Sequence, residues 1–465
     1  MTEILYDSIN ATAKALRNGS VSARELADEA IRRHASISVD LNPYKTWCAD
    51  LARRSAATAD AAFASGTDLG VLQGIPVSIK DLYGVRGADV YAGTPTALPS
   101  KWQYEGPVVG ALRRQLAVIM GKTHTVELAF GGLGVNPHWG TPRNPWDAAR
   151  HRVPGGSSSG AGVSLCEGSA FLALGTDTAG SVRIPASVTG NVGMKTSYGR
   201  WSLQGIVPLS PTLDTAGVLT RSVDDLAHVF PCIDDPHRDN ESPIAVAPLA
   251  GLRIGVPRAT MWNDCEDGID DVCDNLLTDL TRAGAILVDI ELPEASEAVA
   301  LLHKGNVVSA ECDEFLSAEL PAWRETLDPL VASRIKDGGA IEAREYLARR
   351  RLLRELAAAA AARFDDCDVI AAPTVPISPP ILQDVLSVDG YRPRNLASLR
   401  NTCVGNSLSL CALTVPAGID RNSLPVGIQL MAAHGRDREL IATGLGIERH
   451  TGTPLERLGR APLCK

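Results

Sequence analysis

Residues 154–187 bring many small hydroxyl-bearing side chains together. The stretch reads PGGSSSGAGVSLCEGSAFLALGTDTAGSVRIPAS and holds seven glycines and seven serines. Serines set among glycines suit a flexible linker, a phosphate-binding loop or a covalent nucleophile. Each of these three possibilities makes its own demand on the rest of the sequence.

Two of the three possibilities fail on the residues themselves. A flexible linker lacks apolar side chains, whereas residues 164–174 read SLCEGSAFLAL. A P-loop needs Gly-x-x-x-x-Gly-Lys-Ser/Thr, and the chain's Gly121-Lys122-Thr123 has Leu116 in the place of the first glycine. The stretch also opens no Gly-x-Gly-x-x-Gly dinucleotide motif. A nucleophilic serine is therefore the interpretation to test.

One way to activate such a serine uses a histidine. Residues 156–160, GSSSG, match the Gly-x-Ser-x-Gly nucleophile elbow of α/β-hydrolases, with Ser158 as the nucleophile. Histidines that follow in the chain could serve as its base: His228, His434 and His450. The pattern is short and arises easily in a glycine–serine stretch, so this alternative stays open beside the next one.

A second way uses a lysine as the base. The segment GIPVSIKDLYGV (74–85) is typical of a buried strand that delivers Lys80 at its end. A lysine accepts a proton only when its amine is neutral, and with a reference pKa of about 10.4 fewer than about one in a thousand is neutral at pH 7. Burial in apolar surroundings lowers that pKa by roughly 3 to 5. Residues 75–79 provide such surroundings.

Taken together, several segments resemble the amidase signature family. The most specific are the strand ending at Lys80, PGGSSSGAG (154–162) and GTDTAGSVRIPAS (175–187). Others follow the family pattern in the same order: GKTHTVELAFG (121–131), GTPRNPWD (140–147), GNVGMKTSYGR (190–200), LDTAGVLTRSVDDLA (213–227), CDVIAAPTVPISPP (367–380) and LPVGIQLMAAHGRDREL (424–440). The resemblance covers roughly residues 1–230 and 360–450.

The resemblance implies a lysine–serine–serine relay. It assigns the nucleophile to Ser181, the bridging serine, held in a cis peptide, to Ser157, and the base to Lys80. Through this relay Ser181 would attack an amide carbonyl, and water would then hydrolyse the acyl-enzyme. The resemblance also implies an oxyanion hole built from backbone N–H groups of Thr178, Ala179, Gly180 and Ser181.

The resemblance extends to residues around this relay. Those implied to contact substrate or to hold the loop are Ser158, Gly131, Asp177 and Arg183. Ala179 stands where the family more often has glycine, and we expect its methyl group to narrow the pocket or restrict φ.

The expected activity is hydrolysis of the C–N bond of a small amide or ureide-like substrate. An alternative is the A subunit of a glutamyl-tRNA or aspartyl-tRNA amidotransferase, which works with partner subunits. That protein typically has Gln where this chain has Ile184, which weakens the alternative. The run Asp-Thr-Ala-Gly-Ser (177–181) resembles the allophanate hydrolase branch, so the substrate stays open.

The rest of the sequence predicts the framework that positions these residues. Residues 1–65 are predicted to be helical, and strands are predicted near 75–79, 249–258 and 283–292, with further helices at 295–364. This alternation predicts an α/β fold, and the resemblance specifies a large mixed sheet flanked by helices on both faces. We expect a single domain over residues 1–465, with the signature core at 70–230 and a substrate-side helical segment at 295–364.

Composition excludes several function classes. The net charge is −9 without a long basic run, so nucleic acid is not an expected partner. Glu3 and Asp7 stand where a signal peptide would need a basic start and an apolar run, so we expect no signal peptide. The sequence has no apolar run of about 18 residues, so we expect no membrane-spanning helix. The cysteines and histidines form no metal-binding motif, so we expect neither metal nor cofactor. The expectation is a cytoplasmic enzyme with a small-molecule amide substrate; a homodimer would match many members of the family.

Overall fold

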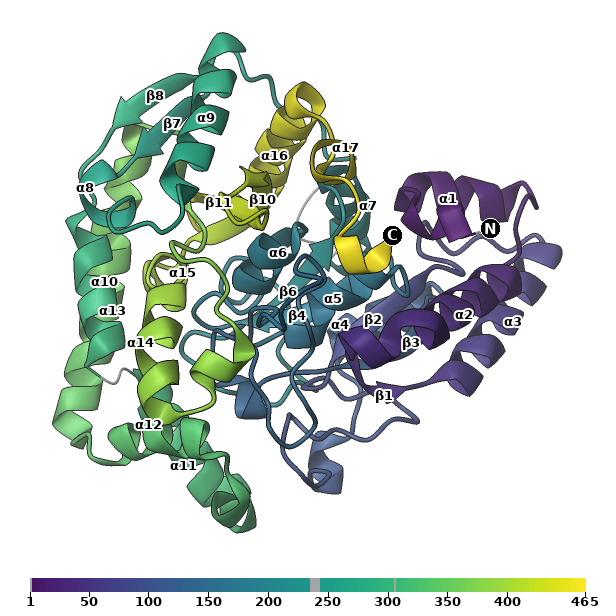
Figure 1. The fold of residues 1–465 in the computed structure, drawn as a ribbon, viewed down its shortest axis with the longest axis horizontal. Helices are drawn as coiled ribbons and strands as arrows, with labels where there is room; N and C mark the ends of the chain where they lie inside the picture. Colours follow the sequence, from purple (N-terminus) through teal and green to yellow (C-terminus); the bar gives the residue numbers. More distant parts are fainter. Residues whose placement is uncertain (1, 235–242, 305–306) are drawn as a thin grey trace.

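The structure is a computed structural model that describes residues 2–234, 243–304 and 307–465. At its centre lies one mixed sheet of eleven strands in the order β1-β3-β2-β4-β6-β5-β10-β11-β9-β7-β8 (Figure 1). The strands are β1 (Tyr44–Trp47), β2 (Pro76–Lys80), β3 (Val118–Thr123), β4 (Leu172–Asp177), β5 (Val192–Lys195), β6 (Thr215–Thr220), β7 (Arg253–Val256), β8 (Ile286–Asp289), β9 (Val369–Pro373), β10 (Cys411–Ile419) and β11 (Pro425–Ala432).

Helices cover both faces of this sheet. Those of the first half of the chain are α1 (Ile9–Arg17), α2 (Ala23–Leu41), α3 (Ala49–Ala64), α4 (Pro107–Arg114), α5 (Ser159–Glu167), α6 (Arg183–Thr189) and α7 (Val223–Ile233). Those of the second half are α8 (Arg258–Met261), α9 (Ile269–Arg282), α10 (Pro293–His303), α11 (Val307–Glu319), α12 (Pro329–Gly339), α13 (Ala343–Ala361), α14 (Val388–Leu399), α15 (Thr402–Ser407), α16 (Asp437–Thr451) and α17 (Pro454–Leu458).

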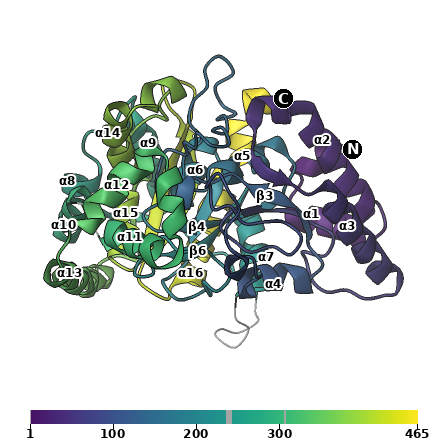
Figure 2. The same cartoon turned by 90° about the horizontal axis from the view of Figure 1, so that it is seen from below.

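The helices form two layers and a separate group. Helices α2, α5 and α6 pack together as one layer, and α4, α7 and α16 pack together as another. Helices α10 to α14 gather at the end of the molecule opposite α1 to α3, which Figure 2 shows from below. The predicted α/β fold, with a mixed sheet between helices, is confirmed.

Strand register brings the sequence motifs to one edge of the sheet. Strand β2 runs parallel to both β3 and β4, with Lys80 opposite Thr123 and Ile79 opposite Leu174. Strand β4 pairs antiparallel with β6, which places Asp177 opposite Thr215. Because the carboxyl ends of parallel strands meet at one edge, Lys80 and the loop after β4 become neighbours although they are far apart in sequence.

The predicted elements are largely present, with different boundaries. The prediction that residues 1–65 are helical is wrong at β1, which lies between α2 and α3 and pairs with β3. The capping box at Ser22 and Glu25 opens α2 as expected, but the helix continues to Leu41 instead of ending near His34. Strand β2 includes Lys80 itself, and the predicted helical segment 295–364 corresponds to α10 through α13. No helix within the described ranges is long and apolar enough to cross a membrane.

Candidate active site

The side chain of Lys80 is fully buried among hydroxyl groups. Its Nζ donates hydrogen bonds to Ser157 Oγ at 2.7 Å and to Thr176 Oγ1 at 2.8 Å. Burial lowers the pKa of Lys80 from 10.5 to about 7, although the charges of Asp177 and Asp214 act in the opposite direction. A large share of this amine is therefore neutral near pH 7, as a general base requires.

Ser157 lies in a tightly packed loop between β3 and α5. The Gly156–Ser157 peptide bond is cis, as the family resemblance implies. A Cβ on Gly156 would lie 2.6 Å from the Gly134 nitrogen, so the loop has no room for a side chain there. The next residue, Ser158, donates its N–H to the Ser181 carbonyl oxygen at 3.3 Å, which holds this loop against the one that carries Ser181.

Ser181 lies in the turn between β4 and α6 and is 4% exposed. The turn depends on Gly180, whose φ is +132°, a backbone region that L side chains rarely adopt. A Cβ at this position would also lie 2.1 Å from Thr402 Oγ1. The sequence therefore supplies glycine where both the backbone and the neighbouring helix α15 require it.

Backbone N–H groups of this turn could stabilise an oxyanion. The structure gives no hydrogen-bond acceptor within the described residues to the N–H groups of Thr178, Ala179 and Ser181. Gly180 differs, because its N–H donates to Asp177 Oδ1 at 2.8 Å. The Gly180 N–H is thus engaged by the carboxylate in this structure, and the four-residue oxyanion hole stays a prediction.

A buried ion pair between Asp177 and Arg183 holds the turn that carries Ser181. Arg183 donates to both carboxylate oxygens of Asp177, at 3.0 and 3.1 Å, and both side chains are fully buried. Arg183 also donates to Gln429 Oε1 at 2.9 Å and to Asn406 Oδ1 at 2.6 Å. Burial alone would raise the pKa of Asp177, but Arg183 outweighs it and lowers that pKa to about 2. These two residues thus tie the turn to β11 and α15.

The residues of the nucleophile-elbow alternative do not come together. Ser158 Oγ faces the Thr176 carbonyl oxygen at 3.5 Å. His228 contacts its own helix at Asp224, while the other two histidines contact Ser409 and Asp279, respectively. Among the described residues, none of these histidines forms a hydrogen bond with Ser158, so Ser158 has no base.

Ser181 faces a small pocket between the core and the α10–α14 group. The pocket volume is about 20 Å³, room for roughly one water molecule. Gly131 lines it, and a Cβ there would lie 2.2 Å from Tyr391 Oη. Leu302 and Arg334 line it from the helical group, and Arg334 is the one charged residue among the described residues that do so.

Sequence reasoning missed several residues of this site. Thr176 is the second partner of Lys80, and Asp214 Oδ1 accepts a hydrogen bond from Thr178 Oγ1 at 2.5 Å. Burial raises the pKa of Asp214 to about 6. Both residues stand inside segments that resemble the family. The role of Thr176 depends on the pairing of β2 with β4, and that of Asp214 on the pairing of β4 with β6, which the segments alone do not reveal.

Comparisons with known proteins agree with this geometry. The family model described as Amidase matches residues 25–441. A 2-amino-5-chloromuconic acid deaminase from Comamonas testosteroni is 49% identical over 451 residues, which cover 97% of each chain. The A subunit of a glutamyl-tRNA(Gln) amidotransferase from Azoarcus sp. (strain BH72) is more distant, 31% identical over 489 residues, covering 97% of this chain and 99% of that one.

A solved structure supports the same assignment. The crystal structure of an amidase matches with a TM-score of 0.87 at 29% identity, covering 96% of this chain and 100% of the other. The fold of this chain, its sheet topology and its sequence therefore agree over nearly the whole length. The chain belongs to the amidase signature family, and it is an enzyme that hydrolyses carbon–nitrogen bonds.

Proposed function

We propose that this enzyme releases ammonia from a small carboxylate-bearing substrate, with Ser181 as nucleophile, Ser157 as proton bridge and Lys80 as base. The observation that carries the proposal is the environment of Lys80. Its amine is fully buried and contacts two hydroxyl oxygens, and no carboxylate of the described residues forms an ion pair with it. A buried lysine without an ion-pair partner has a lowered pKa, which suits proton transfer and not structural pairing.

The proposed reaction on an amide has two halves. In the first, Lys80 takes the proton of Ser157 while Ser157 takes that of Ser181, and Ser181 Oγ forms a bond to the carbonyl carbon. The N–H groups of Thr178, Ala179 and Ser181 stabilise the oxyanion, and the amine leaves with the proton returned through Ser157. In the second half, a water molecule gives its proton to Lys80 through Ser157 and attacks the ester carbonyl. The bond between Ser181 Oγ and the acyl carbon then breaks, the acid leaves, and the proton returns through Ser157 to Ser181 Oγ.

Two features support an acidic substrate. The deaminase relative acts on an amino-substituted acid, as its name states, and shares 49% of its residues with this chain. Arg334 lines the pocket of Ser181 and is held there by the Phe130 carbonyl, to which its NH1 donates at 2.9 Å. A guanidinium is well suited to a carboxylate because its N–H groups match the two oxygens.

Covalent labelling with a fluorophosphonate tests the nucleophile. We expect the label on Ser181, mapped by peptide mass spectrometry. Ser181→Ala should lose the label and release ammonia about 10³-fold more slowly or worse, because removing a covalent nucleophile leaves only binding and oxyanion stabilisation. Ser158→Ala is the matched control and should keep both label and turnover. A label on Ser158, or near-normal turnover in Ser181→Ala, would reject the assignment.

A further inference from the structure

A second cavity, of about 320 Å³, lies between the end of β5 and helix α13. Three cations line it, Lys195, Arg350 and Arg354, and among the described residues that line it none is Asp or Glu. Thr212, Asn406 and two serines supply hydroxyl and amide groups around them. We refer to it below as the basic cavity. Its lining offers hydrogen-bond donors and positive charge, in contrast to the mainly apolar pocket at Ser181.

Lys195 is the buried member of this group, at 1% exposure. Its Nζ donates to the Thr196 carbonyl oxygen at 2.7 Å, the one hydrogen bond that the described part of the chain gives it. An ammonium has three donors, so two of its N–H groups have no acceptor among the residues that the structure describes. The nearby carboxylates are already engaged, Asp177 by Arg183 and Asp437 by Arg200 and the Ser197 N–H. Although burial lowers the pKa of Lys195 to about 8, the charged form predominates at pH 7.

The two arginines are one turn apart on α13 and line the same cavity. Other arginines of this helix have acidic partners, for example Arg349 with Glu345 and Arg351 with Glu355. Neither Arg350 nor Arg354 forms an ion pair with a described residue. Like charges at this spacing repel each other weakly, and an anion bound between them would relieve that repulsion. Arg354 is exposed to solvent, and Arg350 is half-buried with its guanidinium 5.7 Å from the centre of the Tyr346 ring.

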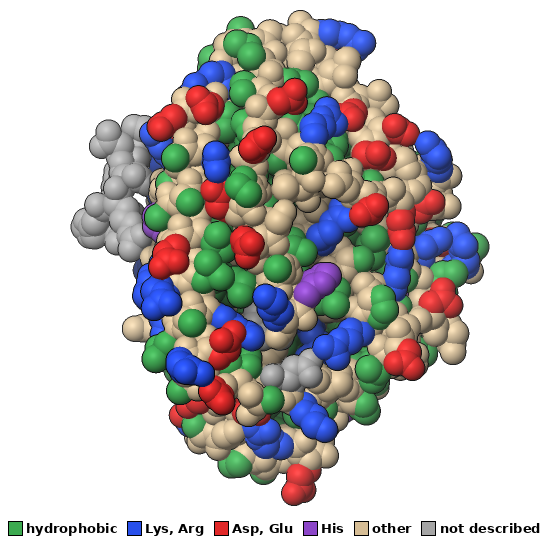
Figure 3. Space-filling model, turned by 90° about the vertical axis from the view of Figure 1, so that its left-hand side faces the viewer, with side chains coloured by type: hydrophobic (Ala, Val, Ile, Leu, Met, Phe, Trp, Pro, Cys, Tyr) green, Lys and Arg blue, Asp and Glu red, His purple; other side chains and the backbone are tan. Residues whose placement is uncertain are grey.

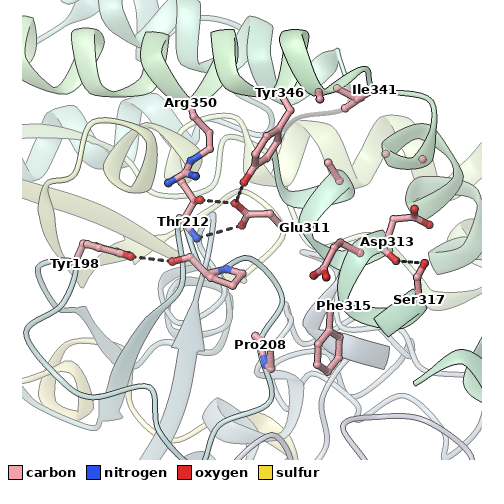
Figure 4. A pocket seen from close by; sticks show the side chains of 16 residues that line it. Tyr198, Pro208, Thr212, Glu311, Asp313, Phe315, Ser317, Ile341, Tyr346 and Arg350 are labelled. Atoms are coloured by element: carbon pink, nitrogen blue, oxygen red, sulfur yellow. Dashed lines mark hydrogen bonds between the residues drawn. The ribbon is translucent and has the colours of Figure 1, made fainter. Parts of the chain in front are cut away.

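Among the described residues, the neighbouring carboxylate of Glu311 forms no ion pair with these three cations, although it lines a cavity together with Arg350. Figure 4 shows Arg350 reaching from α13 toward Thr212, with Glu311 beyond it. Glu311 is engaged by the hydroxyls of Ser210, Thr212 and Tyr346. It lines a wider cavity of about 860 Å³ together with Asp313 and Glu314, and that cavity shares Tyr198, Thr212 and Arg350 with the basic cavity. The face formed by α10 and α13 also carries Lys and Arg side chains among its acidic ones (Figure 3).

The basic cavity is in contact with the catalytic turn. Asn406 Nδ2 and Thr215 Oγ1, both from its lining, donate to the Asp177 carbonyl oxygen at 3.0 and 2.8 Å. A small apolar cavity shares Leu213 with the basic cavity and Ala179 with the pocket of Ser181. An anion bound in the basic cavity would therefore contact residues that hold the turn carrying Ser181.

We propose that the basic cavity binds a carboxylate of a small organic acid, with Arg350 and Arg354 pairing with its oxygens and Lys195 as the buried cation behind them. The carboxylate could belong to a second acid group of the substrate or to a separate acid molecule. The first source rests on the proposed function; the second does not. Both sources share the same chemistry, and the two arms of the experiment below separate them.

Calorimetric titration with muconate tests the binding site. Muconate is a six-carbon dicarboxylate without a C–N bond, so the enzyme cannot consume it. We expect the double variant Arg350→Gln/Arg354→Gln to bind it about tenfold more weakly or worse, because charge-assisted pairs are lost. Arg351→Gln is the matched control, since Arg351 is an exposed arginine on the same helix with Glu355 as partner. An unchanged Kd in the double variant overturns the proposal.

Kinetics then identify the source of the carboxylate. If it belongs to the substrate, the double variant raises KM for an amide that carries a carboxylate and leaves KM for a neutral amide unchanged. If it belongs to a separate acid, muconate changes the wild-type rate on the neutral amide and has no effect on the double variant. If neither kinetic response is observed, muconate binds as an adventitious additive only, and the proposal is overturned. Ser181→Ala separates the proposed function from the proposed anion site. This variant should lose turnover and keep the wild-type Kd for muconate.

Discussion

Lys80 and Lys122 lie on adjacent parallel strands, and both side chains are fully buried. Lys122 Nζ forms an ion pair with Asp81 Oδ1 at 2.7 Å and donates to the Asp89 carbonyl oxygen at 3.1 Å. Among the described residues, Lys80 Nζ donates only to hydroxyl oxygens, those of Ser157 and Thr176. Burial lowers the pKa of both amines, but for Lys122 the adjacent Asp81 opposes this strongly.

The difference shows how the partner decides the role of a buried lysine. A carboxylate keeps the amine charged and turns it into a structural ion pair. Hydroxyl groups leave the neutral form accessible and can pass a proton onward. Lys80 and Lys122 share their residue type, their burial and their place near the end of a strand, and differ in their partners. Substitution of Lys80 should therefore mainly reduce activity, and substitution of Lys122 should mainly reduce stability.

The largest expected effect is the loss of activity in Lys80→Met. General acid–base catalysis contributes about 10²- to 10⁴-fold, and we expect kcat to fall by about 10³-fold or more. Lys122→Met should keep kcat per folded molecule within about tenfold, because that lysine does not contact the relay. Ammonia release, normalised to the folded fraction by circular dichroism, measures both. Equal losses in the two variants would contradict the comparison.

The two variants should also differ in stability. Lys122→Met leaves Asp81 buried without its ion-pair partner, which costs about 3–5 kcal/mol of unfolding free energy. Lys80→Met leaves no such charge, so its unfolding free energy at pH 7 should be at least that of the wild type. Denaturant unfolding of the two variants and the wild type measures this difference.

The pH dependence of stability isolates Lys80 further. Its pKa is about 7 in the folded chain and 10.5 as its ordinary value, so between these pH values the unfolded chain binds more protons. The wild type should therefore gain stability from this group as pH rises from about 7 to 10.5, by up to roughly 5 kcal/mol at about 1.36 kcal/mol per pKa unit. Lys80→Met should lack this gain, and parallel curves for the two proteins would show that Lys80 is charged in the folded state.

How much the sequence predicts depends on whether the relevant contacts are local. The strand before Lys80, the capped helix at Ser22 and the glycines around Ser157 follow from local patterns, and the structure shows them. The family resemblance also related Ser157 to Ser181, whose loops do touch. Predicting these features requires only residues that are close in sequence, or family motifs that occur in the expected order along the chain.

Non-local contacts set the limit. The role of Thr176 at Lys80 and that of Asp214 at Thr178 arise from the register of β2, β4 and β6, which no single segment specifies. The same holds for the arginines of α13, where the run RRRLLRE gives no sign that Arg350 and Arg354 line a cavity while Arg351 has a partner. Hydrogen bonding of the Gly180 N–H to Asp177 likewise depends on the folded turn and leaves no mark in the sequence.

The smallest expected effect concerns Ala179, where this chain departs from the family's more frequent glycine. Ala179 is half-buried and lines the pocket of Ser181, and its carbonyl oxygen accepts a hydrogen bond from Thr402 Oγ1 at 2.7 Å. Ala179→Gly keeps the backbone N–H, so kcat on a small amide should change by less than about fivefold, while added backbone freedom costs roughly 0.5–1 kcal/mol of stability.

The informative readout for Ala179→Gly is the ratio of kcat/KM values for a bulkier and a smaller acyl group. We expect this ratio to rise, because removing the methyl group widens a pocket that has room for about one water molecule. Gly180→Ala is the contrasting neighbour, since its Cβ would lie 2.1 Å from Thr402 Oγ1 at a φ that L residues rarely adopt, and it should lose most activity. If Ala179→Gly leaves the ratio unchanged, the methyl group does not limit the acyl pocket, and selectivity must come from the side chains of the α10–α14 group.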